Sequence, residues 1–157
     1  LKQRNIKLIK LSKNNTINIS ANLKIKPFLV PHREDYSETV GFEIATSKKE
    51  LIYIPDIDNW EKWNISITEL IKNIDFALVD GTFFSEREIE RDISLIPHPL
   101  VKDSLKLFSN LKAKERNKII FTHFNHTNPL IDESSKEHEE VLSKGFRIAK
   151  EGDNFYL

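Results

Sequence analysis

Histidine and aspartate side chains stand where four predicted strands end, and together they could bind a metal ion. They lie in the segments VPHRE (His32), YIPDIDNW (Asp56), SLIPHPL (His98) and FTHFNHTNP (His123 and His126). In an open α/β sheet, ligands bind beyond the strand ends, so residues far apart in the sequence can meet there. The chain has no cysteine, which leaves imidazole and carboxylate as the side chains that would hold Zn, Fe or Mn.

Three of these residues also have structural interpretations, which the sequence pattern leaves open. Asp56 could cap a helix that begins near Trp60, because aspartate is a favoured N-cap residue. His32 could simply lie in a surface loop. His98 stands before Pro99, at the predicted start of a helix, and would then occupy an N-cap position where histidine is uncommon.

The other polar candidates are expected to be mainly structural. On a continuing strand, His123 and His126 would point to opposite faces, so at most one of them is expected to be an inner ligand. His138 lies in the charged segment SSKEHEEV, and we expect it on the solvated face of a helix. The sequence Asp80-Gly81-Thr82 predicts a turn in which the aspartate bonds to nearby backbone.

Composition excludes several classes of protein. The 157 residues carry 24 Lys and Arg against 24 Asp and Glu, and we therefore expect no nucleic-acid partner, which usually requires a basic excess. The 4 glycines are too far apart to form a phosphate-binding loop. No apolar run approaches the about 20 residues of a membrane-spanning helix. The opening segment LKQRNIKLIK is not a secretory signal, and we expect a cytoplasmic protein without a membrane partner.

The elements that must position these side chains follow from the hydrophobic period. Apolar and polar residues alternate through the first third of the chain, which predicts strands, and residues 51–54, 76–79 and 119–121 predict buried strands. Ser-x-x-Glu patterns at 66–69, 85–88 and 134–137 predict helix starts. The order of these elements predicts one α/β domain over residues 1–157, with helices packed on a mixed sheet.

Five segments in this order resemble the pyrroloquinoline quinone biosynthesis protein B family, a branch of the metallo-β-lactamase superfamily. They are VPHREDYSETVGFEI, LIYIPDIDNWEKW, ALVDGTFF, IPHPLV and FTHFNHTNPL. The resemblance runs from about Pro27 to Leu157 and implies a metallo-β-lactamase-like αββα sandwich, with mixed sheets flanked by helices. The superfamily signature H-x-H-x-D-H is absent. We therefore expect the chain to be the C-terminal portion of a longer protein and to lack the N-terminal part of the fold.

The resemblance assigns metal ligation to three residues. His32 matches a histidine that binds one metal ion, Asp56 matches an aspartate that bridges two, and His123 matches the final histidine ligand. It thus implies a divalent metal cofactor, Zn, Fe or Mn, as one or two ions. Three protein ligands with water can hold such an ion.

The resemblance also assigns roles around the metal. Asp80 matches an acidic residue that does not bind the metal itself but contacts and orients the residues that do. His98 matches a catalytic histidine that acts near the leaving group. Asn125, His126 and Asn128 would line the pocket as substrate-binding residues.

For the full-length protein, the resemblance implies a metallo-hydrolase or a non-haem-iron oxygenase that hydroxylates a tyrosine in a peptide-derived precursor. The alternatives are a phosphodiesterase or ribonuclease Z-like hydrolase, and a non-catalytic binding or carrier protein that retains the fold. The expected partner is a small-molecule or peptide-derived substrate. A chain with half a sandwich would expose an apolar sheet face, so we also expect a homo-oligomer or a covering N-terminal segment.

Overall fold

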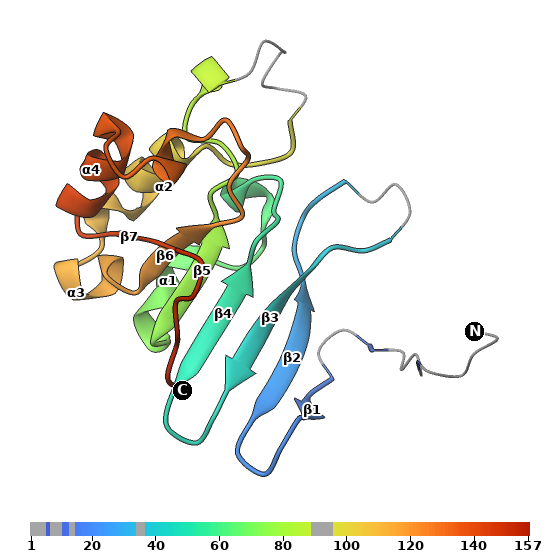
Figure 1. The fold of residues 1–157 in the computed structure, drawn as a ribbon. Helices are drawn as coiled ribbons and strands as arrows, with labels where there is room; N and C mark the ends of the chain where they lie inside the picture. The colour runs from blue at the N-terminus through green and yellow to red at the C-terminus, as the bar shows by residue number, and fades with distance from the viewer. Residues whose placement is uncertain (1–5, 7–10, 13–14, 34–36, 89–95) are drawn as a thin grey trace.

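The computed structural model describes residues 6, 11–12, 15–33, 37–88 and 96–157, which form one mixed β-sheet with helices beside it (Figure 1). The seven strands lie in the sheet in their sequence order. They are β1 (Ile17–Asn18), β2 (Lys24–Leu29), β3 (Val40–Ala45), β4 (Glu50–Ile54), β5 (Phe76–Asp80), β6 (Ile119–Thr122) and β7 (Arg147–Ile148). Strands β1 to β4 pair antiparallel, whereas β4 to β7 pair parallel. The predicted mixed α/β sheet is confirmed.

The helices connect the parallel strands. They are α1 (Ile67–Asn73), α2 (Val101–Leu107), α3 (Ala113–Arg116) and α4 (Lys136–Ser143), with short 3₁₀ turns η1 (Trp60–Lys62), η2 (Glu86–Glu88), η4 (Phe108–Asn110) and η5 (Pro129–Ile131). The predicted cap of α1 is confirmed, because the Ser66 hydroxyl accepts a hydrogen bond from Glu69 N. Helix α4 starts one residue later than predicted, with Ser135 as its cap. The helix predicted from Ser85 begins as η2, and residues 89–95 lie outside the described part.

Helix α2 corrects the predicted N-cap. Its N-cap residue is Leu100, so His98 and Pro99 both precede the helix. The reason lies in the pairing of the incoming segment: Leu100 forms a bridge with Phe83, and Val101 N donates to Phe83 O at 2.9 Å. This pairing holds the chain extended up to Leu100 and delays the first helical turn.

The hydrophobic core lies between the sheet and the helices. The buried side chains of the central strands, such as Ile52, Ile54, Val79 and Phe121, pack against helix residues, including Val101 and Phe108 of α2 and η4 and Val141 of α4. Burial of these side chains is the main stabilisation of the layer pair. No helix among the described residues is long and apolar enough to cross a membrane.

The opposite face of the sheet is also apolar, because side chains alternate along each strand. Paired positions form two rows across it: Pro27, Phe42, Tyr53, Leu78 and Ile120 in one, and Ile25, Ile44, Leu51 and Phe76 in the other. The C-terminal tail passes across the β5 side of this apolar face (Figure 1), where Phe155 meets Phe76 edge-on with 5.6 Å between ring centroids. Phe42 and Tyr53 are half-buried.

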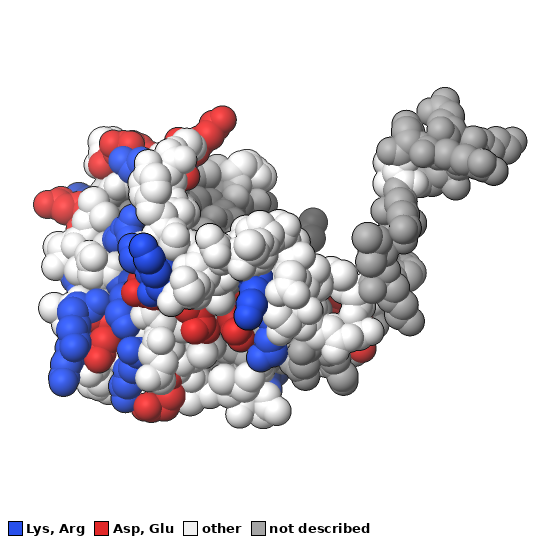
Figure 2. Space-filling model, turned by 90° about the horizontal axis from the view of Figure 1, so that it is seen from below, with Lys and Arg blue, Asp and Glu red and all other residues white. Residues whose placement is uncertain are grey.

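Charged side chains of both signs share the surface. Figure 2 shows Lys and Arg side chains interspersed with Asp and Glu side chains across one face of the molecule. Several of them form ion pairs, among them Lys62 with Asp58 at 2.6 Å and Lys150 with Glu133 at 2.7 Å. Charges of both signs are thus mixed on this face rather than separated into patches.

Candidate metal centre

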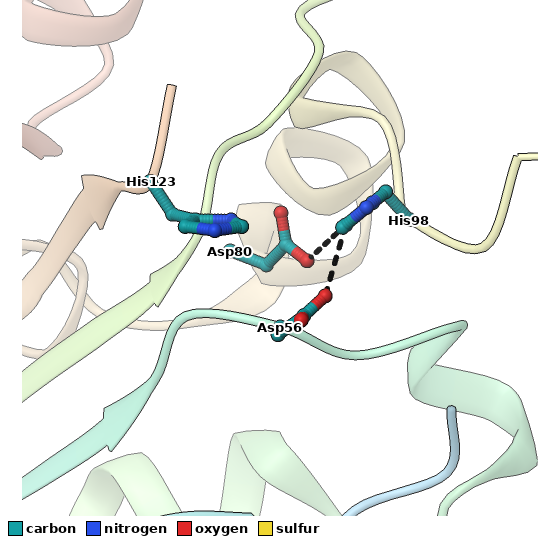
Figure 3. Close-up of side chains that lie close together, drawn as sticks. All are labelled: Asp56, Asp80, His98 and His123. Atoms are coloured by element: carbon teal, nitrogen blue, oxygen red, sulfur yellow. Dashed lines mark hydrogen bonds and ion pairs between the residues drawn. The ribbon is translucent and has the colours of Figure 1, made fainter. Parts of the chain in front are cut away.

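The carboxyl ends of three parallel strands bring a carboxylate or an imidazole to the same edge of the sheet. Asp56 follows β4, Asp80 is the last residue of β5, and His123 follows β6 directly. His98 reaches this edge from the extended segment before α2. Figure 3 shows all of these side chains converging beyond the strand ends. Side chains separated by up to 67 positions thus meet, as the strand-end argument predicts.

The four side chains are close enough to share one ion. Asp56, Asp80, His98 and His123 each offer a ligand atom, and these atoms lie within 4.8 Å of one another. His98 Nδ1 lies 2.8 Å from Asp80 Oδ2 and 3.6 Å from Asp56 Oδ1. His32 adjoins this cluster, because its Nε2 lies 3.0 Å from Asp56 Oδ1. All three residues predicted as metal ligands are therefore at or beside the cluster, and their ligand role stays a prediction.

Asp80 is fully buried, and its carboxylate is saturated with hydrogen bonds. Oδ1 accepts from Thr82 N at 2.9 Å and from Thr82 Oγ1 at 2.7 Å, and Oδ2 accepts from Ile57 N at 3.1 Å and lies 2.8 Å from His98 Nδ1. A carboxylate offers about four lone-pair sites, and all are used. Asp80 is thus suited to orient its neighbours, and its predicted role beside the metal ligands stays a prediction.

Thr82 is a site residue that the sequence reasoning missed. Its hydroxyl lies 3.0 Å from His123 Nδ1 and 3.2 Å from His98 Nδ1, in addition to its bond to Asp80. The only available signal was its place after Asp80-Gly81, which predicts a turn that returns the hydroxyl to the carboxylate. No local sequence pattern indicated that this hydroxyl would also contact His98 and His123.

Residue 123 has a left-handed backbone. His123 has φ of 62°, which non-glycine residues rarely adopt. The strand therefore does not continue, and the chain turns back toward β5, where Asn125 N donates to Thr82 O at 3.0 Å. Gly81 permits this close approach, because a Cβ there would lie 2.9 Å from Thr122 O.

His32 and Asp56 form an unusual contact. Their atoms Nε2 and Oδ1 are 3.0 Å apart and buried, yet they do not meet in hydrogen-bond geometry, and neither atom has another hydrogen-bond partner among the described residues. His32 Nδ1 also lies 3.4 Å from Arg33 O. Two buried ligand-type atoms without a hydrogen-bond partner in the described part of the chain thus lie side by side, and a divalent cation bound between them would satisfy both.

The surroundings of His98 favour its charged form. Burial lowers the pKa of His98, but its hydrogen bond to Asp80 and the charges of Asp80 and Asp56 outweigh burial, and the pKa lies above the ordinary value of 6.5. His98 also lines a cavity of about 550 Å³, together with Asn59, Trp60, Glu61, Pro99, Leu100, Asp103, Lys106 and Leu107. His98 therefore borders both the cluster and a space for a ligand.

Comparison with known families matches residues 1–124 to the family described as the beta-lactamase superfamily domain. The chain belongs to this superfamily. Among solved structures, Zn²⁺-bound PqqB from Methylobacterium extorquens superimposes with a TM-score of 0.75 at 24% identity, covering 94% of this chain and 51% of that one. The metallo-β-lactamase fold protein YhfI from Bacillus subtilis gives a TM-score of 0.57 at 14% identity, covering 90% of this chain and 52% of that one.

Two curated proteins similar to this chain carry the same name. Coenzyme PQQ synthesis protein B from Nitrosococcus oceani is 29% identical over 140 residues, which is 81% of this chain and 43% of that protein. The protein of the same name from Pseudomonas putida is 26% identical over 167 aligned positions, which is 95% of this chain and 54% of that protein. The chain thus spans about half the length of these relatives. The metallo-β-lactamase-like fold is confirmed, with one sheet and its helices among the described residues.

The three residues predicted to bind substrate, Asn125, His126 and Asn128, lie in different environments. Asn128 is buried, and its side chain is engaged with backbone: Nδ2 donates to Gly81 O at 2.6 Å, and Oδ1 accepts from Leu130 N at 2.9 Å. Asn125 donates to Thr127 Oγ1 at 2.6 Å, and His126 is exposed. Substrate binding by these residues stays a prediction.

Two structural interpretations from the sequence are wrong. Asp56 is not a helix cap, because the Asn59 side chain caps η1 by accepting from Glu61 N at 2.8 Å. His138 is not solvated but buried, with Nδ1 2.9 Å from Leu130 O. The turn η5 folds back over the start of α4 and covers that face of the helix.

Proposed function

We propose that the protein containing this chain is a divalent-metal enzyme of the metallo-β-lactamase superfamily, with the reaction class of coenzyme PQQ synthesis protein B. Its reaction is the metal-dependent hydroxylation of a tyrosine in a peptide-derived precursor. Two comparisons support this proposal: the curated relatives carry that name, and the structurally similar PqqB from M. extorquens binds Zn²⁺.

The single observation that carries the metal proposal is the pair of neighbouring buried atoms without a hydrogen-bond partner among the residues that the structure describes, His32 Nε2 and Asp56 Oδ1. Unpaired buried polar atoms cost free energy, and this pair is 3.0 Å apart beside the cluster of Asp80, His98 and His123. His32, Asp56 and His123 would hold the ion. When bound, such an ion supplies Lewis acidity to a substrate oxygen and lowers the pKa of water.

The chain's own residues would orient the substrate and move protons. Asp80 fixes the ring of His98 through the 2.8 Å contact at Nδ1, so His98 can hold a proton at the border between cluster and cavity. Trp60 and Leu107 give that cavity an apolar lining, and Glu61 and Lys106 give it polar groups. The mixed lining suits a substrate with both an aromatic or aliphatic part and charged groups.

A second candidate function is hydrolysis of a phosphodiester, and the state of His98 favours it. Because Asp80 and Asp56 raise the pKa of His98, its protonated form is favoured and could donate a proton to a leaving oxygen. Both candidates share the same metal ligands.

Metal titration of the protein after chelation tests the shared part of both candidates. We expect Zn²⁺, Mn²⁺ or Fe²⁺ to bind, and Asp56→Asn to weaken binding by at least about 10-fold. Asp58→Asn is the matched control, since Asp58 pairs with Lys62 on the surface nearby. Absence of binding, or equal binding by Asp56→Asn, would contradict a metal centre and favour a carrier protein.

Turnover assays then separate the two reactions. For the oxygenase, dioxygen uptake is expected with a tyrosine-containing peptide and an added two-electron reductant, since one oxygen atom enters the ring and the other leaves as water. For the hydrolase, release of nitrophenol from bis(p-nitrophenyl) phosphate is expected. Hydrolysis without dioxygen uptake would replace the first candidate by the second.

A further inference from the structure

We propose that Thr82 is a positioning residue that fixes the tautomer of His123, so that His123 presents Nε2, and not Nδ1, to the centre. The inference follows from counting protons around one buried hydroxyl. It deepens the proposed function in one respect, since the consequence for metal binding rests on the metal centre proposed above. The tautomer itself does not depend on a metal.

The count starts at Asp80, whose ionised carboxylate can only accept hydrogen bonds. All its contacts must therefore be donors. Two are backbone N–H groups, of Ile57 and Thr82. The third is the Thr82 hydroxyl at 2.7 Å from Oδ1, and the fourth is His98 Nδ1 at 2.8 Å from Oδ2. Both of these atoms must point a proton at Asp80.

A hydroxyl group has one proton, so this geometry commits the Thr82 proton to Asp80. Thr82 Oγ1 then has only lone pairs for its other neighbours. His123 Nδ1 lies 3.0 Å from that oxygen. The bond between them requires a proton on His123 Nδ1, which leaves the lone pair of the ring on Nε2.

The opposite assignment creates a repulsive contact. If Thr82 donated to His123 instead, Thr82 Oγ1 and an oxygen of the fully buried Asp80, Oδ1, would be two acceptors 2.7 Å apart. Leaving a buried acceptor without a donor is costly, and more so when the acceptor is charged. Asp80 therefore determines the direction of the hydroxyl, and the hydroxyl determines the tautomer.

The backbone supports the same arrangement. Because residue 123 adopts φ of 62°, the chain leaves β6 and lies against the Asp80-Gly81-Thr82 turn. Gly81 N donates to Thr122 O at 2.8 Å, which ties the two segments together next to the side chains in question. The His123 ring is thus held over Thr82 by main-chain contacts as well as by its own hydrogen bond.

Nuclear magnetic resonance of protein labelled with ¹⁵N-histidine tests the inference directly, because the chain has only 5 histidines. Spectra of the chelator-treated protein at about pH 9, well above the ordinary imidazole pKa of about 6.5, report which ring nitrogen carries the proton. We expect His123 in the Nδ1–H form. Thr82→Val should shift it toward the Nε2–H form, and Thr82→Ser, which keeps the hydroxyl, should restore the Nδ1–H form.

His138 serves as an internal control in the same spectra. Its Nδ1 faces the carbonyl of Leu130, an obligate acceptor, so it must stay Nδ1–H in every folded variant. A changed His138 signal in Thr82→Val would report misfolding of that variant. In that case the spectra of the wild-type protein and of Thr82→Ser test the tautomer of His123. The inference is overturned if wild-type His123 is Nε2–H, or if folded Thr82→Val keeps the Nδ1–H form.

Metal titration separates this inference from the proposed function. Zn²⁺ affinity should fall about 10-fold in Thr82→Val and stay near wild type in Thr82→Ser, as expected for a residue that orients a ligand. Failure of the wild-type protein to bind any metal would refute the metal centre and leave the tautomer result standing. Equal Zn²⁺ affinity in Thr82→Val and wild type would refute the positioning role alone.

Discussion

Asp80 Oδ2 and His98 Nδ1 lie 2.8 Å apart, and the carboxylate of this pair is completely buried. The pair joins the end of β5 to the segment that leads into α2, which are 18 positions apart. Because Asp80 also accepts from the backbone of Ile57, it connects the chain after β4 to the same point. One carboxylate thus holds together three of the segments that form the candidate centre.

Replacing Asp80 should therefore destabilise the fold strongly. In Asp80→Asn, an amide N–H₂ group replaces an oxygen that faces two donors, and we expect a loss of about 2–4 kcal/mol in the free energy of unfolding. Urea titration measures it. Asp75→Asn is the control at the other end of β5, where the exposed Asp75 side chain accepts from Glu50 N; its cost should stay below about 1 kcal/mol. Equal effects of both changes would contradict the special role of Asp80.

Glycine at residue 123 should be better tolerated than alanine. The φ of 62° strains any residue with a Cβ, whereas glycine adopts it freely. Both changes remove the imidazole, so we expect His123→Gly to be more stable than His123→Ala by about 1 kcal/mol. Thermal unfolding of the two variants gives this difference, and alanine equal to or better than glycine would argue against the left-handed backbone.

The stability should depend on the titration of Glu88. Burial, the largest cause, and the charge of Glu137 raise the pKa of Glu88 above 4.5, against the hydrogen bonds that it accepts from Ser85 and Phe84 backbone. A carboxyl with a raised folded-state pKa is favoured protonated, so its contribution to stability is lost as pH rises from the unfolded-state value through the folded-state one. Glu88→Gln should therefore stabilise the protein at neutral pH, by about 0.5 kcal/mol after solvent screening.

Chemical denaturation at two pH values measures this effect. The gain in Glu88→Gln should disappear below about pH 4, where the wild-type carboxyl is protonated in both states. Glu86→Gln is a matched control on the same turn, because the pKa of Glu86 is lowered instead by hydrogen bonding and by Lys102. A stabilising effect of Glu86→Gln of the same size would show that the gain reflects net charge alone.

The apolar face should make this chain associate when it is produced on its own. Phe42 and Tyr53 lie in its rows, and large apolar patches promote contact with other molecules. We expect concentration-dependent association in sedimentation velocity, and we expect Phe42→Gln to reduce it. Glu43→Gln is the control on the opposite face of the same strand. A monomer with no binding of an apolar dye would show that the face is already covered.

Much of the fold could be predicted because the determinants are local in sequence. The strands β4, β5 and β6 follow from short apolar runs, and the cap of α1 follows from Ser66 and Glu69. The convergence of Asp56 and His123 follows from parallel pairing, since equivalent strand ends must lie at one edge. The hydrophobic period of the sequence is therefore sufficient to predict where the candidate centre lies.

The finer features could not be predicted because they depend on distant partners. The bridge from Leu100 to Phe83 displaces the start of α2, and the packing of η5 buries His138. Thr82 shares its hydroxyl with residues 16 and 41 positions away, and no local pattern encodes that meeting. The charged residues of α4 correctly predicted a helix with a solvated face, but they could not show that η5 covers the face that carries His138.

The strict alternation along β5 has a consequence for how the gene can vary in length. A single codon inserted between Phe76 and Val79 would turn Val79 to the opposite face of the sheet and displace the Asp80 carboxylate from His98, so it would damage packing and chemistry together. The hairpin turn between β3 and β4, residues 46–49, has neither constraint. Changes of length should therefore be tolerated in that turn and not in β5.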